Sequence, residues 1–179
     1  EASKTVVMHT QVDAPRVTLP PLVPFQEFSK LTKLIGVIKL VVLFLIKKKV
    51  LREDTMKRLW GTTDPLEIAG YHLTSRMQEE SFPAELSFLR GTANNKLPDR
   101  VKDLNLFLDS KGILRSQGRM DNTNAFNHDL IHPIVLGKQH PFTNLIIKFC
   151  HSKVQHLGVQ PSLNRVREDG FRLIHPINS

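Results

Sequence analysis

The sequence predicts a mainly α-helical fold with one small β-hairpin. Hydrophobic residues make up 40% of the 179 residues, which is enough apolar side chain to bury a core. Several long segments repeat apolar residues at helical spacing, whereas residues 104–117 read as strand, tight turn and strand. The chain has one cysteine, which excludes an internal disulfide framework and a zinc site made of cysteine pairs within this chain.

The first half of the chain is expected to be helical after an extended start. Four prolines between positions 15 and 24 oppose regular structure, so residues 1–27 are expected to form an extended linker. Residues 28–48 carry apolar side chains at helical spacing, and Ser29 or Thr32 is expected to cap this helix. Asp64 precedes Pro65, a pair typical of a helix start. A helical connector is therefore expected over residues 28–98, with its further helices at 52–60, 64–82 and 84–89.

Residues 99–136 are expected to be extended. Leu104–Leu108 and Ile113–Gln117 predict two strands, and Asp109 and Gly112 take the first and fourth positions of a type I turn. A further short extended run is expected over residues 133–136. Residues 137–179 then return to helical spacing, with one helix over 141–153 and another that opens at Pro161, separated by Gly158.

The charge balance favours a polyanionic partner. Lysine and arginine number 25 against 17 acidic residues, which gives a net charge of +8. Arg165, Arg167 and Arg172 are the candidate nucleic-acid-binding residues, because a short helix would present the first two to phosphates. No base-reading motif is evident, so DNA binding is expected to be weak and independent of sequence. A second cluster, Lys47–Lys49 with Arg52, Lys57 and Arg58, is expected to be a solvated surface.

The most apolar segment, Leu34–Ile46, is too short to span a membrane. It has 13 residues and contains Lys39, whereas a spanning helix needs about 20 apolar residues. The segment is therefore expected to be buried in the helical connector, and a membrane partner is not expected. The alternative is a protein–protein or membrane-surface interaction module over residues 28–49. Residues 1–25 lack a secretory signal pattern, so a nuclear or cytoplasmic location is favoured over secretion.

His151 and His156 are the candidate metal ligands. Residues five apart on one helix point about 140° away from each other, so both could bind one ion only if the helix ends between them. Gly158 follows at a position suited to such a turn. Cys150 points elsewhere on the helix and is expected to be a small core residue. Surface or capping histidines are the alternative interpretation of this pair.

Several linked stretches give the histidine pair a wider context. Residues 132–140, 142–151, 154–160 and 163–167 together resemble the amino-terminal zinc-binding domain of integrases from Pao/BEL-type retrotransposons. The hairpin at 107–119, residues 82–86 and, more loosely, residues 28–46 resemble the segments that precede that domain in such polyproteins. The resemblance implies an incomplete three-helix zinc-binding module over residues 137–179. It also implies zinc as the cofactor, with His151 and His156 as the histidine half of a tetrahedral site whose Cys-x-x-Cys half is absent from this chain.

The same resemblance implies a fragment of an integrase region, ancestrally used to position DNA and to self-associate. The catalytic carboxylates of an integrase follow the zinc module, so no catalysis, no catalytic residue and no small-molecule substrate are expected here. Five aspartates are instead expected to cap or turn the chain: Asp99, Asp103, Asp109, Asp121 and Asp129. His140 and His175 are the substitutes to consider if His151 and His156 are not the ligands.

Overall fold

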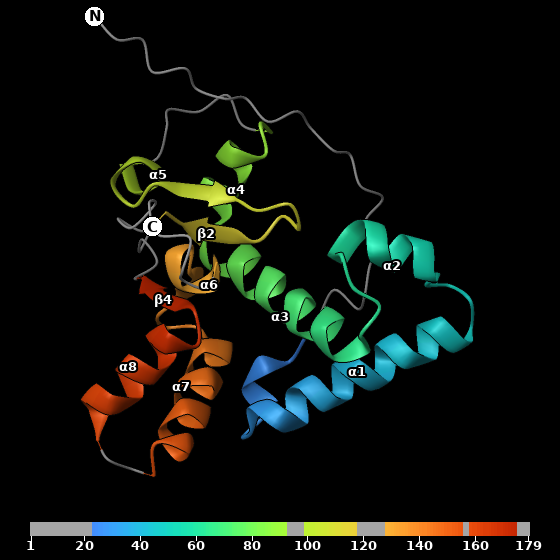
Figure 1. Ribbon diagram of the computed structural model, residues 1–179, viewed down its shortest axis with the longest axis horizontal. Coiled ribbons are helices and arrows are strands. Elements are labelled where there is room, and N and C mark those ends of the chain that lie inside the picture. The colour runs from blue at the N-terminus through green and yellow to red at the C-terminus, as the bar shows by residue number, and fades with distance from the viewer. Residues whose placement is uncertain (1–22, 93–98, 118–127, 156–157, 175–179) are drawn as a thin grey trace, which may run out of the picture.

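The computed structural model describes residues 23–92, 99–117, 128–155 and 158–174. Over these ranges the chain forms eight α-helices, one short 3-10 helix and a single four-stranded sheet (Figure 1). The predicted class, mainly α with a small β part, is confirmed, although the β part is larger than the expected hairpin. Of the linker predicted over residues 1–27, residues 1–22 lie outside the described residues.

The elements follow one another in a simple order. The helical part begins with η1 (Phe25–Glu27), α1 (Leu31–Lys47), α2 (Glu53–Trp60), α3 (Pro65–Ser81), α4 (Pro83–Leu89) and α5 (Asp99–Asp103). The hairpin and the remaining elements are β1 (Leu106–Leu108), β2 (Leu114–Ser116), α6 (His128–Ile131), β3 (Ile134–Gly137), α7 (Pro141–Lys153), α8 (Val159–Glu168) and β4 (Phe171–Ile174).

The expected hairpin is present and its turn has the predicted chemistry. β1 and β2 pair antiparallel, and the backbone N–H of Gly112 donates to the carbonyl of Asp109 over 2.9 Å. The Asp109 carboxylate also accepts from the N–H groups of Lys111 and Ile113, both at 2.9 Å. Aspartate thus closes the turn through its side chain as well as its backbone.

Two further strands extend the hairpin into a sheet of order β1-β2-β3-β4. β3 lies antiparallel to β2, and β4 lies parallel to β3 over four residue pairs. The chain reaches β4 from β3 through α7 and α8, so the proposed module boundary at residues 136–137 falls inside β3. After α8 the chain forms a strand where the resemblance implied a three-helix module. β3 lies where the extended run over residues 133–136 was expected, whereas β4 was not predicted. Its pairing with β3 joins residues more than 30 apart, such as Ile134 and Phe171, and leaves no local periodic signal.

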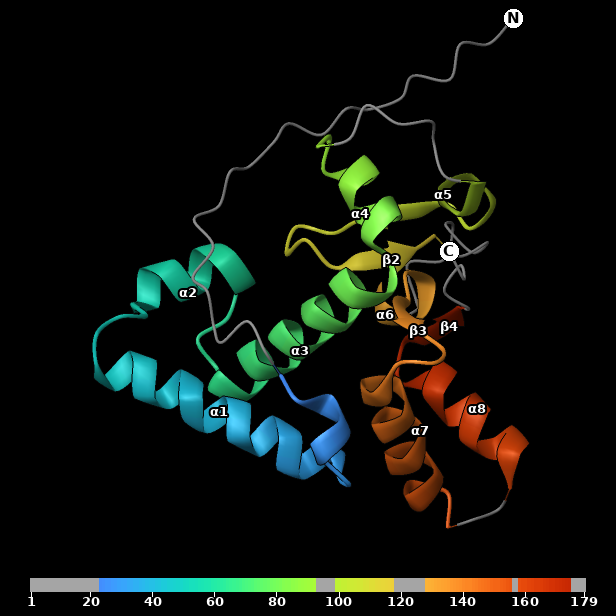
Figure 2. The same cartoon turned by 180° about the vertical axis from the view of Figure 1, so that it is seen from behind.

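The sheet separates two apolar clusters because alternate strand residues point to opposite faces. Leu136 joins the larger cluster, with side chains of α1, α3 and α7, whereas Val135 joins the smaller cluster, with side chains of α4 and α5. Figures 1 and 2 show α3 in the middle of the molecule, between α1 and the sheet. Helices therefore cover both faces, and residues from the connector and from 137–174 share the larger core.

Helix starts follow the predicted chemistry in one case and depart from it in two. The Asp64 carboxylate accepts from the N–H of Leu66 over 2.9 Å, and Pro65 occupies the first turn of α3, as expected. The expectation that Ser29 or Thr32 caps α1 is wrong, since Lys30 takes the cap position without a side-chain hydrogen bond. α8 begins at Val159, two residues before Pro161, directly after Gly158, whose φ of 108° is outside the helical range.

The apolar segment of α1 is buried on one side only. Leu34, Ile38 and Val42 are buried about one helical turn apart, in the core that α1 shares with α3 and α7. Val37, Leu40, Leu43 and Phe44 are exposed on other sides of the same helix, so the expectation that the whole segment is buried is wrong. No helix in the described ranges is both long enough and apolar enough to cross a bilayer.

Gln78 of α3 joins the two middle strands of the sheet. β2 and β3 share only one residue pair in register, Arg115 with Ile134. The buried Gln78 amide donates to the carbonyls of Leu114 (2.8 Å) and Val135 (2.9 Å), and its oxygen accepts from the N–H of Leu114 (2.8 Å). The side chain therefore satisfies backbone groups that the short ladder would leave without partners.

We predict that Gln78→Met lowers the free energy of unfolding by roughly 3 kcal/mol. Methionine keeps the volume but removes the amide N–H and C=O, so the buried backbone groups lose their partners. Gln160→Met is the matched control, since this glutamine is exposed on α8 and its one hydrogen bond with a described residue is to the neighbouring Asn164. Urea denaturation followed by circular dichroism measures both variants. Equal midpoints for the two would show that the amide does not hold the strands.

His72 on α3 makes the fold sensitive to acid. Burial, followed by the Arg76 charge, lowers the pKa of this imidazole to about 4, and Glu79 opposes the shift only in part. Its Nε2 is buried without a hydrogen-bond partner among the described residues. The folded state therefore holds a neutral His72 between pH 4 and pH 6.5, where the unfolded chain takes up a proton.

We predict that this group stabilises the fold fully above about pH 6.5 and that its contribution falls as the pH drops towards 4, by roughly 2–3 kcal/mol in total. The measurement is the urea midpoint at pH 7 and pH 4.5 for the natural chain and for His72→Gln, which cannot titrate. The variant is expected to lose less stability between the two pH values. Identical losses would assign the acid sensitivity to other groups.

Candidate metal and nucleic-acid site

The helical hairpin α7–α8 carries most of the candidate residues. α7 ends at Lys153 and Gln155 adopts φ 51°, so the helix stops between positions 151 and 156. This is the geometric condition for both histidines to reach one ion. His156 itself lies outside the described residues, so the structure gives no distance between the two imidazoles.

His151 is oriented by a hydrogen bond across the helix pair. Its Nδ1 lies 2.8 Å from the Oγ of Ser162, and that hydroxyl donates its proton to the carbonyl of Gly158 over 2.7 Å. Because the serine proton is used in this way, Ser162 accepts from Nδ1–H, and the neutral imidazole carries its lone pair on Nε2. Metal-binding histidines are commonly held by such a bond from their other nitrogen.

The remaining ligands of a tetrahedral site are not assembled in the described part of the chain. No three or more His, Cys, Asp or Glu side chains lie together there as a metal-binding group. Cys150 is buried, and its thiol donates to the Asp169 carboxylate at 3.6 Å. Burial, followed by the Asp169 charge, raises the pKa of this thiol to about 11, so it stays protonated, as the expected core residue would.

The substitute ligand His140 already has a structural role. It caps α7, where its Nδ1 accepts from the N–H of Phe142 over 3.1 Å and its Nε2 lies 3.0 Å from the Glu80 carboxylate. Its ring also packs edge-on against Phe25. Nδ1 therefore caps α7, Nε2 joins it to α3, and the ring packs it against η1. His175 lies outside the described residues.

The three candidate arginines are not equivalent. Arg165 is bound to carboxylates on its own helix, 2.8 Å from Asp169 and 3.6 Å from Glu168. Residues two apart on a helix point in nearly opposite directions, so Arg165 and Arg167 extend to different sides of α8, and their joint binding of phosphates stays a prediction. Arg167 is exposed, and its one described hydrogen bond is a long one to Asn164.

Arg167 and Arg172 both border a cavity of about 480 Å³ between α8, β4 and α6. The other residues that line it are apolar: Leu130, Pro133, Leu163, Val166, Phe171 and Leu173. The Arg172 guanidinium contacts the Ser116 hydroxyl at 3.4 Å. Within the described ranges neither arginine has a carboxylate partner. The sequence did not predict this cavity, because α6 and β4 are brought together only by the pairing of β4 with β3.

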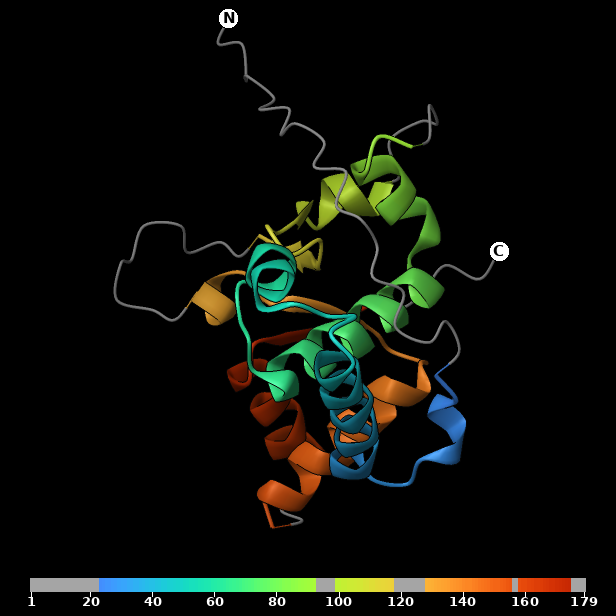
Figure 3. The ribbon, with the colours of Figure 1, turned by 90° about the vertical axis from the view of Figure 1, so that its right-hand side faces the viewer.

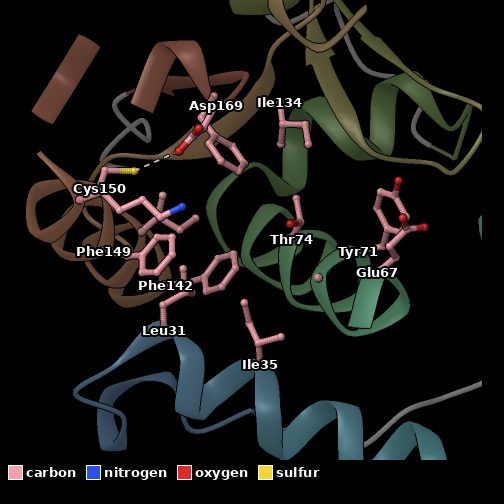
Figure 4. A pocket seen from close by; sticks show the side chains of 14 residues that line it. Leu31, Ile35, Glu67, Tyr71, Thr74, Ile134, Phe142, Phe149, Cys150 and Asp169 are labelled. Carbon is pink, nitrogen blue, oxygen red and sulfur yellow. Dashed lines mark hydrogen bonds between the residues drawn. The ribbon is translucent and has the colours of Figure 1, made fainter. Parts of the chain in front are cut away.

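A second cavity, of about 520 Å³, lies between α1, α3 and α7. Figure 4 shows its mostly apolar walls, with Leu31 and Ile35 from α1 and Phe142 and Phe149 from α7. Polar groups also line it, and two of them are paired: Tyr71 with Lys111, and Cys150 with Asp169, which both belong to the cavity wall. The raised pKa of the Cys150 thiol keeps it protonated beside that carboxylate.

We predict that zinc binds this chain too weakly to organise its fold. Each missing thiolate removes a charged donor that water replaces poorly, and His151 and His156 supply only two of four ligands. After brief chelation the purified chain is expected to hold well under one zinc per molecule, by elemental analysis, and added zinc is expected to leave the melting temperature unchanged. One tightly held zinc per chain would contradict this and return His140 and His175 to consideration.

Comparisons of the chain with protein-family models, with curated proteins and with solved structures found no match. The resemblance to the integrase zinc-binding domain therefore depends on the sequence stretches quoted above. Arg167 and Arg172 border the smaller cavity without a described acidic partner, whereas Arg165 is paired with Asp169.

Proposed function

We propose that this chain belongs to the integrase region of a Pao/BEL-type retrotransposon polyprotein and binds the phosphate backbone of DNA without regard to sequence. In this proposal the chain positions DNA and performs no catalysis of its own. Arg167 and Arg172 make the contacts, and Arg165 stabilises α8 through its ion pairs with Asp169 and Glu168.

The observation that supports the proposal is that these two arginines border one cavity and have no described acidic partner. No carboxylate lines that cavity among the described residues. An unneutralised guanidinium matches a phosphate well, because its planar set of donors binds two oxygens at once. The absence of any base-reading motif supports binding through the backbone only.

The zinc half of the proposal concerns the connection between α7 and α8. His151 would hold the ion through Nε2, its ring fixed by Ser162, and His156 would be the second histidine ligand. In the four-ligand site of such integrases a bound zinc would join the end of α7 to the start of α8. In this chain, with two of the four ligands, zinc is expected to bind too weakly to fix α8.

We predict that Arg167→Gln with Arg172→Gln weakens binding to a labelled DNA duplex at low salt and flattens the salt dependence of log K by roughly 0.9 for each lost phosphate contact. Fluorescence anisotropy with two duplexes of unrelated sequence measures the effect, and both duplexes are expected to bind alike. Arg165→Gln is expected to change affinity much less, since its charge is already neutralised.

Lys102→Gln with Lys148→Gln is the matched control. Both lysines are exposed on other elements, and the double variant removes the same charge. If the control and the arginine variant lose the same affinity, DNA binding follows net charge alone and the cavity has no part in it. A strong preference for one duplex would contradict backbone binding.

A further inference from the structure

The exposed side of α1 differs from an ordinary solvated helix surface. Val37, Leu40 and Phe44 are 45%, 66% and 56% exposed, and their spacing places them within an arc of about 60°. Leu43 lies beside them, and Val50 in the following turn is also exposed. These five residues, the α1 outer face, make up most of the large apolar side chains exposed in the described ranges.

Positive charge surrounds the α1 outer face. Residues 30–52 contain six lysines, one arginine and no aspartate or glutamate. Lys33 and Lys47 lie on the same stripe as the apolar residues, one at each end. Lys48 lies 5.8 Å from the Phe44 ring, and Lys49 follows it. None of the seven cations has an ion pair with a residue that the structure describes, whereas Lys57 of α2 pairs with Glu53.

The place of α1 in the fold makes this face accessible. Its opposite side is fixed in the core by Leu34, Ile38 and Val42. Figure 3, which looks at the side of the molecule that carries α1 and α2, shows α1 in front of the other helices. The helix can therefore lie flat on an external surface while the core stays behind it.

From these observations we infer that the α1 outer face binds the surface of an anionic lipid bilayer, with α1 in the plane of the membrane. Apolar side chains enter the region between headgroups and acyl chains, and the lysines around them contact anionic headgroups. This inference goes beyond DNA binding and uses a different part of the molecule. It develops the membrane-surface alternative that the sequence left open for residues 28–49 and names the side chains and the lipid charge involved.

Charge argues for this occupant over two others. A second copy of the chain, in either direction, would bring Lys33 and Lys47 against lysines of its partner. DNA would satisfy the lysines but would gain nothing from Leu40 and Phe44, which must stay next to water in that case. An anionic bilayer accepts both kinds of side chain at once.

The test measures binding of the full 179-residue chain to vesicles of phosphatidylcholine with roughly 30% phosphatidylserine, and to vesicles of phosphatidylcholine alone. Binding to the anionic vesicles is expected, with part of it surviving about 0.5 M salt because of the apolar contacts. Leu40→Asn with Phe44→Asn is expected to weaken binding by roughly tenfold or more, because two apolar side chains no longer enter the membrane. Val159→Asn, at an exposed valine of α8, is the control and should bind normally.

A charge variant tests the lysines separately. Lys47→Gln with Lys48→Gln and Lys49→Gln is expected to weaken binding by roughly tenfold or more and to reduce its salt dependence. Lys102→Gln with Lys148→Gln and Lys153→Gln removes the same charge from other elements and should have a much smaller effect. Equal losses for the two triple variants would reduce the interaction to non-specific attraction and overturn the inference.

A fluorescence measurement keeps the test decisive if the asparagine variant does not fold. The chain has one tryptophan, Trp60, so Phe44→Trp in a Trp60→Phe background reports on α1 alone. Its indole is expected to be quenched by brominated lipid, and the indole of Val159→Trp in the same background is not. The inference fails if the Phe44→Trp indole is not quenched on bound vesicles, if the natural chain does not bind anionic vesicles, or if Leu40→Asn with Phe44→Asn instead abolishes a dimer seen by ultracentrifugation.

Discussion

The hydrogen bonds of the Gln78 side chain hold together the sheet on which the rest of the structure depends. β2 and β3 meet at a single residue pair, and the amide of Gln78 reaches both strands from α3. β1 is attached to β2, and β4 is attached to β3. One side chain of a central helix therefore connects the hairpin half of the sheet to the half that carries α7 and α8.

A second buried polar residue supports the same junction. Arg115 of β2 donates to the carboxylates of Asp109 and Asp129 at 2.7 and 2.9 Å, and to the carbonyl of His132 at 2.7 Å. It thereby ties the hairpin turn to α6 and to His132, two residues before β3. A buried guanidinium is tolerated because several acceptors share its charge and its N–H groups. Gln78 and Arg115 thus set the position of β3, from which α7, α8 and β4 follow.

The pairing of acidic residues also decides where the excess positive charge lies. Glu79 pairs with Arg76 and Arg90, and Asp169 pairs with Arg165. In the described ranges the cations around α1, together with Arg167 and Arg172, have no such partners. Two groups of cations without described acidic partners therefore lie in separate places, one around α1 and one beside the smaller cavity. One adjoins an exposed apolar face and the other a cavity, and this difference leads to the two separate partners proposed.

The sequence by itself determined the local elements and part of their chemistry. Asp64 with Pro65 marked the start of α3, Asp109 with Gly112 marked the hairpin turn, and helical spacing placed α1 and α7 within a few residues of their observed bounds. These features depend on neighbours in the chain, so a single sequence carries them. It also indicated that α7 must end between positions 151 and 156 for the two histidines to meet.

Only the tertiary structure decided which side of each element faces the core, water or a charge. Periodicity places Val37 and Leu40 beside Leu34 in one apolar segment, yet only packing against α3 determines which of them is buried. Arg165 and Arg167 look alike in the sequence. In the fold the charge of Arg165 is paired and that of Arg167 is not paired with a described carboxylate, because Asp169, one turn beyond Arg165, binds the Arg165 guanidinium. The parallel pairing of β4 with β3 and the bridge made by Gln78 join residues far apart in the chain. Such contacts have no local pattern, because their energy comes from groups that meet only after the chain has folded.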